Sequence, residues 1–124
     1  MSFRICKSFD FSAAHRLTGL HPGHQCMRPH GHNYQVQVQL DAPLLDSHGF
    51  VLDYGDLAPF KRWLDATLDH QDLNQVWPEL GNPTAEHLAR ELAAMAVKLC
   101  GIPDTIRVSV GVSETPKTWA WWLP

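Results

Sequence analysis

The sequence predicts an α+β domain in which an antiparallel sheet carries two helices on one face. Residues 33–40 alternate strictly, which is typical of a half-buried antiparallel strand: the apolar positions are Tyr34, Val36, Val38 and Leu40, and three glutamines lie between them. Two later segments repeat apolar residues every three or four positions, which indicates amphipathic helices. The order strand, strand, helix, helix, strand, strand then gives the two-layer architecture.

The N-terminal half is expected to supply two strands, and His15 joins His30 and His32 if these strands pair as a hairpin. Residues 3–14 alternate loosely and are rich in Phe and Ile, which indicates the first strand. Residues 17–29 contain Gly and Pro at four positions and are expected to be a loop that leads into the strand at 33–40. A short strand is expected at 50–52, just before Asp53.

The C-terminal half is expected to supply both helices and the remaining strands. The first helix is predicted over 57–68. The second begins near Asn82-Pro83-Thr84, with Asn82 or Thr84 as its N-cap, and continues to residue 99, where Gly and Pro follow. Two further strands are expected, at 106–112 and 119–123.

Length and composition limit the class of protein. The 124 residues make one domain, 1–124, with 44% hydrophobic and 19% charged residues, a globular balance. The net charge of −3 and the lack of a Lys/Arg run argue against nucleic acid as a partner. No stretch is long and apolar enough to span a membrane, and no leader precedes the first strand, so a cytoplasmic protein is expected.

The three cysteines do not suggest a disulfide framework, because their number is odd and their spacing wide. Cys6 in the first strand and Cys100 at a helix end are predicted to be buried thiols. Cys26 lies in the loop rich in Gly, Pro and His, where an exposed side chain is expected.

A metal site is predicted where the hairpin strands meet the loop. His30 and His32 point to the same face of the second strand, and His15 ends the first strand. Three neutral imidazoles with an open fourth position are typical of catalytic zinc, although they also suit other divalent ions. Two alternatives stay open: ordinary strand or surface histidines, and a closed structural site with Cys26 as the fourth ligand.

Two further segments carry acid–base candidates. Asp69 and His70 are expected to face one pocket from a turn rather than to bond directly, and a histidine with a carboxylate suits proton transfer. The alternative is a cationic His70 at a helix C-terminus. Glu114 continues the apolar parity of 106–112, so it needs a partner such as an Arg or a ligand with two N–H donors. A strand that ends one residue early would instead expose it.

Taken together, these segments resemble the tetrahydropterin synthase family over nearly the whole chain. The resemblance lies in Ala13-Ala14-His15-Arg16-Leu17, Cys26-x-x-x-His30-Gly31-His32-Asn33-Tyr34, Leu68-Asp69-His70-x-x-Leu73-Asn74, Asn82-Pro83-Thr84-Ala85-Glu86 and Glu114-Thr115-Pro116. The three-residue gap between Cys26 and His30 is similar to the 6-carboxytetrahydropterin synthase branch of queuosine and 7-deazapurine biosynthesis. Trp122 departs from the Tyr expected in that branch.

The resemblance implies the tunnelling fold, a ββααββ unit that assembles into rings, typically hexamers with active sites between subunits. It implies one Zn²⁺ per subunit on His15, His30 and His32. Cys26 would act as catalytic base or acid, completed by a proton relay from Asp69 and His70.

The implied substrate is a pterin, 7,8-dihydroneopterin triphosphate, which a zinc-dependent lyase would convert to 6-carboxytetrahydropterin, acetaldehyde and triphosphate. Glu114 would bind the pterin ring with Thr84 near the same pocket, and Arg28, with Arg16 and Lys117, would supply positive charge for the triphosphate. Two alternatives are a 6-pyruvoyltetrahydropterin synthase or related side-chain lyase, and a non-catalytic zinc-stabilised binding domain.

Overall fold

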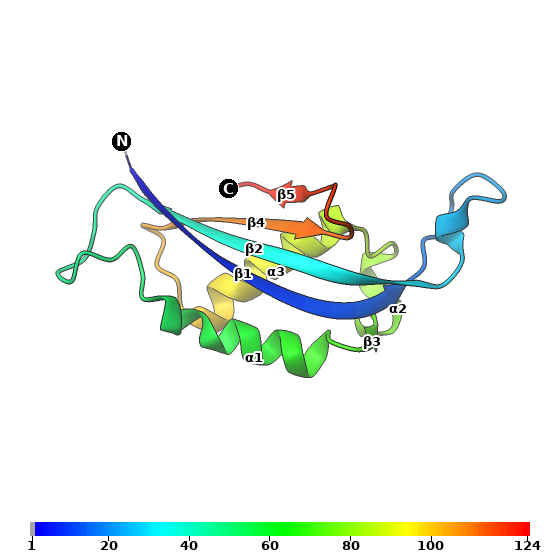
Figure 1. Ribbon diagram of the computed structural model, residues 1–124, viewed down its shortest axis with the longest axis horizontal. Helices are drawn as coiled ribbons and strands as arrows, with labels where there is room; N and C mark the ends of the chain where they lie inside the picture. Colours follow the sequence, from blue (N-terminus) through cyan, green and yellow to red (C-terminus); the bar gives the residue numbers. More distant parts are fainter. Residues whose placement is uncertain (1) are drawn as a thin grey trace.

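A long β-hairpin runs the length of the computed structural model, which describes residues 2–124 (Figure 1). Strands β1 (Phe3–His15) and β2 (His30–Ala42) pair antiparallel along their whole length, from Phe3 opposite Ala42 to His15 opposite His30. The hairpin on which the predicted metal site depends is present, and β2 begins three residues before the expected start at Asn33. This earlier start places His30 and His32 inside the strand.

The sheet has five strands in the order β3-β1-β2-β4-β5. Strands β4 (Arg107–Ser113) and β5 (Ala120–Trp122) continue the antiparallel sheet beside β2, as predicted. Strand β3 (Gln71–Asp72) was not predicted, and it pairs parallel with β1 at residues 13 and 14. The parallel pairing of β3 makes the sheet mixed rather than purely antiparallel. The strand was missed because two residues are too few to show a periodicity in the sequence.

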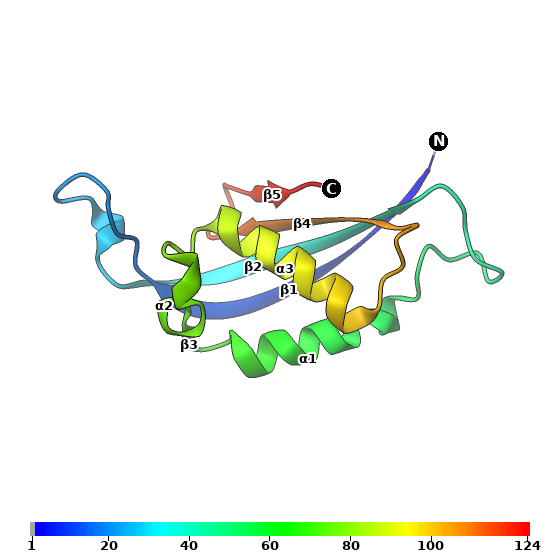
Figure 2. The same cartoon turned by 180° about the vertical axis from the view of Figure 1, so that it is seen from behind.

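Helices α1 (Ala58–Thr67) and α3 (Ala85–Cys100) cover one face of the sheet, which confirms the predicted α+β layers (Figures 1 and 2). Short turns connect the elements: α2 (Leu73–Val76) and the 3₁₀ turns η1 (Gln25–Met27), η2 (Tyr54–Leu57) and η3 (Pro78–Leu80). Among the described residues, no helix has both the length and the apolar character needed to cross a membrane.

The core lies between the sheet and these two helices. Val36 and Val38 of β2, Leu64 of α1 and Leu92 of α3 are fully buried. Each such side chain contributes about 1.5–3 kcal/mol when it leaves water. The alternating pattern of β2 and the helical spacing of α1 and α3 were therefore read correctly as core faces.

The short strand predicted at residues 50–52 is wrong. This segment is a loop, in which the Asp46 carboxylate accepts the backbone N–H groups of His48 at 2.8 Å and Phe50 at 3.0 Å. Asp side chains compete with strand pairing in this way, and the turn leaves Phe50 exposed while Val51 is buried.

The opposite face of the sheet carries polar residues and a tryptophan pair. Trp121 of β5 lies over Gly111 of β4, where an added Cβ would come within 2.6 Å of the indole ring. Trp119 stacks beside Trp121 with ring centroids 6.0 Å apart. A side chain at residue 111 would therefore require the Trp121 ring to move.

Candidate metal centre and adjoining clefts

Three histidines converge where the hairpin meets its long connecting loop. His15 is the last residue of β1 and lies opposite His30, the first residue of β2. Because strand side chains alternate, His32 shares the face of His30. The ring centroids are 4.6 Å apart for His15–His30, 5.2 Å for His15–His32 and 4.9 Å for His30–His32. One ligand atom from each lies within 4.8 Å of the others, so the three residues are positioned to bind a metal ion.

Hydrogen bonds to the far side of two rings favour metal binding. His15 Nδ1 lies 2.8 Å from the Pro83 carbonyl oxygen, and His30 Nδ1 lies 2.7 Å from the Arg28 carbonyl oxygen. Since a carbonyl can only accept, each Nδ1 donates and leaves the Nε2 lone pair free for a metal. Within the described residues, the buried Nε2 atoms of His15 and His32 have no hydrogen-bond partner. Buried nitrogens of this kind fit a bound metal.

Burial keeps the central histidine neutral. His15 is 2% exposed, and this burial lowers its pKa from the ordinary value, although the Pro83 carbonyl acts in the opposite direction. The Tyr34 hydroxyl lies 3.2 Å from His15 Nδ1 and is itself buried, which raises the tyrosine pKa. A neutral imidazole is the form that binds a metal.

Two asparagine side chains hold the backbone that leaves the metal site. The Asn74 amide accepts the Arg16 N–H at 2.8 Å and donates to the Arg16 carbonyl at 2.9 Å. Asn82 makes the same pair of bonds with Thr18, at 2.8 and 2.9 Å. Each amide thus makes the two hydrogen bonds to the N–H and carbonyl of one residue that a neighbouring strand would otherwise make. Sequence reasoning missed this role, although both asparagines lie in motifs it singled out.

The helix cap belongs to Thr84 and not to Asn82. The Thr84 hydroxyl accepts the His87 N–H at 3.2 Å at the start of α3. Within one chain Thr84 lines neither of the two clefts beside the metal site, so its place near Glu114 in the substrate pocket stays a prediction.

The first cleft adjoins the metal site on the loop side and has a volume of about 600 Å³. Its lining includes Cys26, Arg28, His30, His32 and Glu114. Strand β4 ends at Ser113, one residue before Glu114, which agrees with the alternative that the strand stops before this residue. The Glu114 side chain is nevertheless only 30% exposed, with its Oε2 3.5 Å from His32 Nε2. The structure therefore brings a thiol, a carboxylate and a guanidinium to two of the three histidines.

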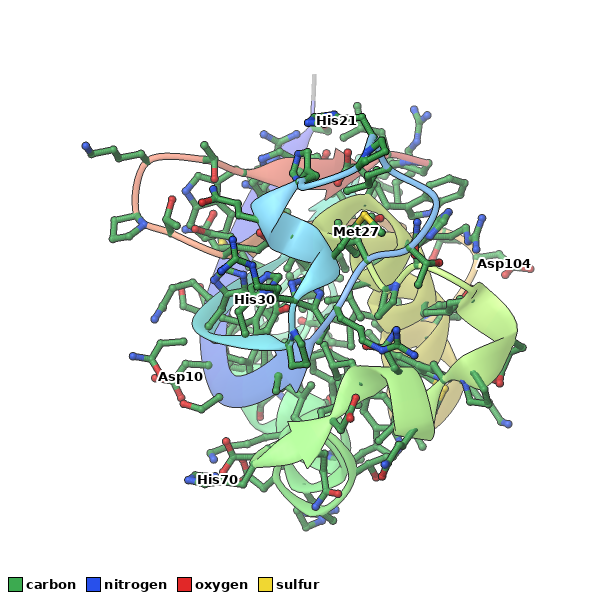
Figure 3. All side chains as sticks on the ribbon, turned by 90° about the vertical axis from the view of Figure 1, so that its right-hand side faces the viewer. Asp10, His21, Met27, His30, His70 and Asp104 are labelled. Carbon is green, nitrogen blue, oxygen red and sulfur yellow. The ribbon has the colours of Figure 1, made fainter. Side chains whose placement is uncertain are left out.

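The second cleft, of about 510 Å³, lies on the side of β3 and is lined by His70 together with residues 12–14, 31–33 and 71–72. The two clefts share only Gly31 and His32. Within one chain, His70 and Cys26 therefore line different clefts. In Figure 3 the labelled His70 lies well away from the labelled Met27, the residue after Cys26.

Asp69 and His70 bond directly, contrary to the expectation for adjacent side chains. His70 Nδ1 lies 2.9 Å from Asp69 Oδ2, and His70 has a positive φ of 61°. Asp69 Oδ1 also accepts the Ser12 N–H at 2.8 Å. The Ser12 bond, and then His70, lower the pKa of Asp69.

The cysteine predictions were partly wrong. Cys6 is exposed, because it lies opposite Gln39 on the face of the sheet that the helices do not cover. Cys100 is half-buried. Partial burial raises the pKa of both thiols. Cys26, predicted to be exposed, is also half-buried, within the first cleft.

The fold is that of an α+β domain of the tunnelling-fold class, and its three histidines are positioned to bind a metal. The sequence matches the family model of 6-pyruvoyl tetrahydropterin synthase over residues 4–123, and the chain belongs to this family. Membership of this family of lyases confirms the resemblance, the predicted fold and the predicted enzyme class.

Two curated relatives are both named 6-carboxy-5,6,7,8-tetrahydropterin synthase. The protein from Rickettsia conorii is 32% identical, with 91% of this chain and 94% of the relative covered. The one from Bacillus subtilis is 30% identical, with 99% and 86% covered. The solved structure of Caenorhabditis elegans 6-pyruvoyl tetrahydropterin synthase superimposes with a TM-score of 0.86 at 24% identity, covering 100% of this chain and 96% of that one. At that identity the structural likeness shows the fold alone.

Proposed function

We propose that this chain is a 6-carboxy-5,6,7,8-tetrahydropterin synthase that converts 7,8-dihydroneopterin triphosphate to 6-carboxytetrahydropterin, acetaldehyde and triphosphate. The names of the curated relatives support the carboxy branch, as does the spacing of Cys26 and His30. The single structural observation that carries the proposal is the first cleft, where Cys26 and Glu114 lie beside His30 and His32. Queuosine biosynthesis in the cytoplasm is the proposed setting.

The proposed metal is Zn²⁺, one per subunit, held by His15, His30 and His32. Three neutral imidazoles bring no negative charge, so a bound zinc ion would supply Lewis acidity for the hydroxylated side chain of the substrate. The carbonyl groups of Pro83 and Arg28 hold two of the rings in the tautomer that this requires.

Cys26 is the proposed acid or base for proton transfer at the substrate side chain. It lies in the same cleft as the metal ligands, and a thiolate is a competent base when cationic groups stand near it. Glu114 is the proposed anchor for the pterin ring, because a carboxylate accepts two parallel N–H bonds from a guanidine-like edge. Its Oε2 lies 3.5 Å from His32 Nε2, and a carboxylate has further lone pairs for such a ligand.

Arg28 is the proposed contact for the triphosphate. Arg28 lines the cleft of Cys26 and supplies a positive charge there, although the net charge of the chain is −3. Arg16 and Lys117 are secondary candidates for the same role. We expect Arg28→Ala to raise KM strongly with little change in the metal content.

The proposed active site lies between subunits of a ring, with a hexamer as the expected assembly. His70 is 81% exposed at its side chain and lines the second cleft, whereas Cys26 lines the first. A relay from Asp69 and His70 to Cys26 therefore needs the first cleft of one subunit to meet the second cleft of another.

The proposal is tested by incubating the zinc-loaded protein with dihydroneopterin triphosphate and identifying the products by mass. Acetaldehyde together with 6-carboxytetrahydropterin supports the carboxy branch, and a pyruvoyl product would assign the chain to the sister branch. Cys26→Ala and Cys26→Ser should both lose turnover and keep their zinc. Loss of zinc in both variants, with no pterin converted by the wild type, would favour the closed Cys/His₃ binding domain.

A further inference from the structure

The turn that carries Cys26 is capped by a histidine. His24 precedes the 3₁₀ turn η1 with φ −63° and ψ 127°, and its Nδ1 accepts the backbone N–H of Cys26 at 3.0 Å. Extended backbone geometry with a side chain that accepts from a residue two positions later is the N-cap arrangement. His24 thus hydrogen-bonds to the backbone of Cys26, the proposed acid or base.

This hydrogen bond fixes the tautomer of His24. A backbone N–H can only donate, so His24 Nδ1 must be unprotonated, and the proton of the neutral ring lies on Nε2. His15 and His30 have the opposite arrangement, because their Nδ1 atoms face carbonyl oxygens. The hydrogen-bond partners therefore divide the histidines near this loop into metal ligands, with a free Nε2, and a capping residue.

While the bond to Cys26 is made, the same argument excludes a metal on Nε2 of His24. The rings of His21 and His24 lie 4.9 Å apart, within the range of the three ring pairs at the metal centre. A metal on Nε2 of His24 would need the proton on Nδ1, opposite the Cys26 N–H. The bond to Cys26 and metal binding at that nitrogen are thus mutually exclusive.

Both backbone groups of Cys26 are held, and His24 holds one of them. The Cys26 carbonyl accepts the Leu17 N–H at 2.8 Å, which ties the turn to the backbone just beyond His15. The Cys26 N–H is held by the His24 ring. Without that ring, the Cys26 N–H loses its acceptor. The turn is then held by the Leu17 bond and by two backbone bonds of 3.1 Å, from the Met27 N–H to the His24 carbonyl and from the Arg28 N–H to the Gln25 carbonyl.

We propose that His24 is a positioning residue for Cys26, whose ring fixes the turn η1 so that the thiol stays in the cleft with His30, His32 and Glu114. The inference rests on the proposed function for the role of Cys26. His24 itself touches neither substrate nor metal in this assignment. Asn, a common N-cap residue, carries an acceptor oxygen at the position of Nδ1 and is therefore the conservative replacement.

The test compares His24→Ala, His24→Asn and His21→Ala in the zinc-loaded protein. Loss of a cap changes a local equilibrium by a factor of about five to ten, so we expect kcat of His24→Ala to fall about that much, with KM and zinc content unchanged. His24→Asn should return kcat to within about twofold of the wild type, since it restores the acceptor. His21→Ala removes a neighbouring imidazole of the same loop and should retain wild-type kcat.

A second readout does not depend on turnover. The rate at which iodoacetamide alkylates Cys26 is measured with and without zinc by peptide mass spectrometry, with Cys6 and Cys100 as internal references. In the wild type and His24→Asn we expect zinc to change the Cys26 rate, because the thiol is held beside the metal centre. In His24→Ala this zinc dependence should be lost, while the reference cysteines react as before.

Three outcomes would overturn the proposal: zinc loss in His24→Ala, failure of His24→Asn to restore kcat and the zinc-dependent alkylation, or an equal effect of His21→Ala. The first would make His24 a metal ligand. If the wild type converts no pterin, the proposed function fails, but the alkylation series still decides whether His24 positions Cys26.

Discussion

The metal centre and the Asp69–His70 pair both rest on histidine hydrogen bonds, but they differ in burial and in partner. His15 is 2% exposed and faces a backbone carbonyl, whereas the His70 side chain is 81% exposed and faces a carboxylate. A carbonyl holds one tautomer in place, while a carboxylate can share a proton with the ring. The first arrangement suits metal binding and is complete within one chain, and the second suits proton transfer and faces outward.

The exposed pair is nevertheless held by the backbone. His70 is the single non-glycine residue with positive φ among residues 2–124. Such a conformation costs about 1–3 kcal/mol and persists where the surroundings hold it. Here Ser12 binds both residues, donating its N–H to Asp69 and accepting the N–H of His70 with its carbonyl. The metal centre and the Asp69–His70 pair therefore differ in exposure to solvent, while the backbone of both is held by hydrogen bonds.

The largest effect is expected from His32→Ala. Loss of a residue that hydrogen-bonds to a metal ligand weakens metal affinity roughly 10- to 100-fold. Loss of a ligand itself should therefore weaken it by more than that. Metal content and competition with a chelator measure the effect. His48→Ala is the matched control, since His48 is an exposed histidine whose side chain is 77% exposed. Unchanged metal affinity in His32→Ala would show that the triad is not the metal site.

The next largest effect tests whether the two clefts meet between subunits. Cys26→Ala and His70→Ala should each lower kcat by about 100-fold or more, as expected for proton-transfer groups. Refolding the two variants together should recover activity, because some interfaces then combine an intact first cleft with an intact second cleft.

A mixture of Cys26→Ala with Glu114→Gln is the control for this complementation. Both changes lie in the first cleft, so no subunit of that mixture has an intact one and activity should stay low. If the mixture of Cys26→Ala and His70→Ala also stays inactive, the shared site is contradicted.

A smaller effect, on stability, is expected from the backbone clamp. Asn82→Ala removes the three side-chain bonds to Thr18, two to its backbone and one to its hydroxyl, and should lower the free energy of unfolding by about 1–3 kcal/mol. Asn82→Asp keeps the acceptor and loses the donor, so it should lie between Asn82→Ala and the wild type. Urea denaturation measures the series, and equal stability of all three proteins would argue against the clamp.

The smallest effect separates a helix cap from a substrate contact. Thr84→Ala should cost about 1 kcal/mol of stability, because α3 loses its N-cap, and Thr84→Ser should restore it. Thermal unfolding and KM are measured together on the three proteins. A raised KM in Thr84→Ala at unchanged stability would return Thr84 to the substrate site implied by the family resemblance.

Most of the layer architecture could be predicted because its signals are local. The alternation in residues 33–40 and the helical spacing in 57–68 each reflect one buried face, which a short window of sequence reveals. The prediction of a short strand at 50–52 was wrong because three apolar residues are too few to show a periodicity. The Asp46 side chain also accepts backbone N–H groups of this loop, which are then not available for strand pairing.

The sequence by itself determined the two-layer fold and the three histidines of the metal centre, since strand alternation places His30 and His32 on one face and the hairpin brings His15 to them. Only the tertiary structure decided how these groups are held and separated. Several of the bonds involved join residues 57 to 68 positions apart, such as Ser12 to Asp69 and His15 to Pro83. Contacts over such distances depend on how the chain folds back on itself, which no local period of the sequence records.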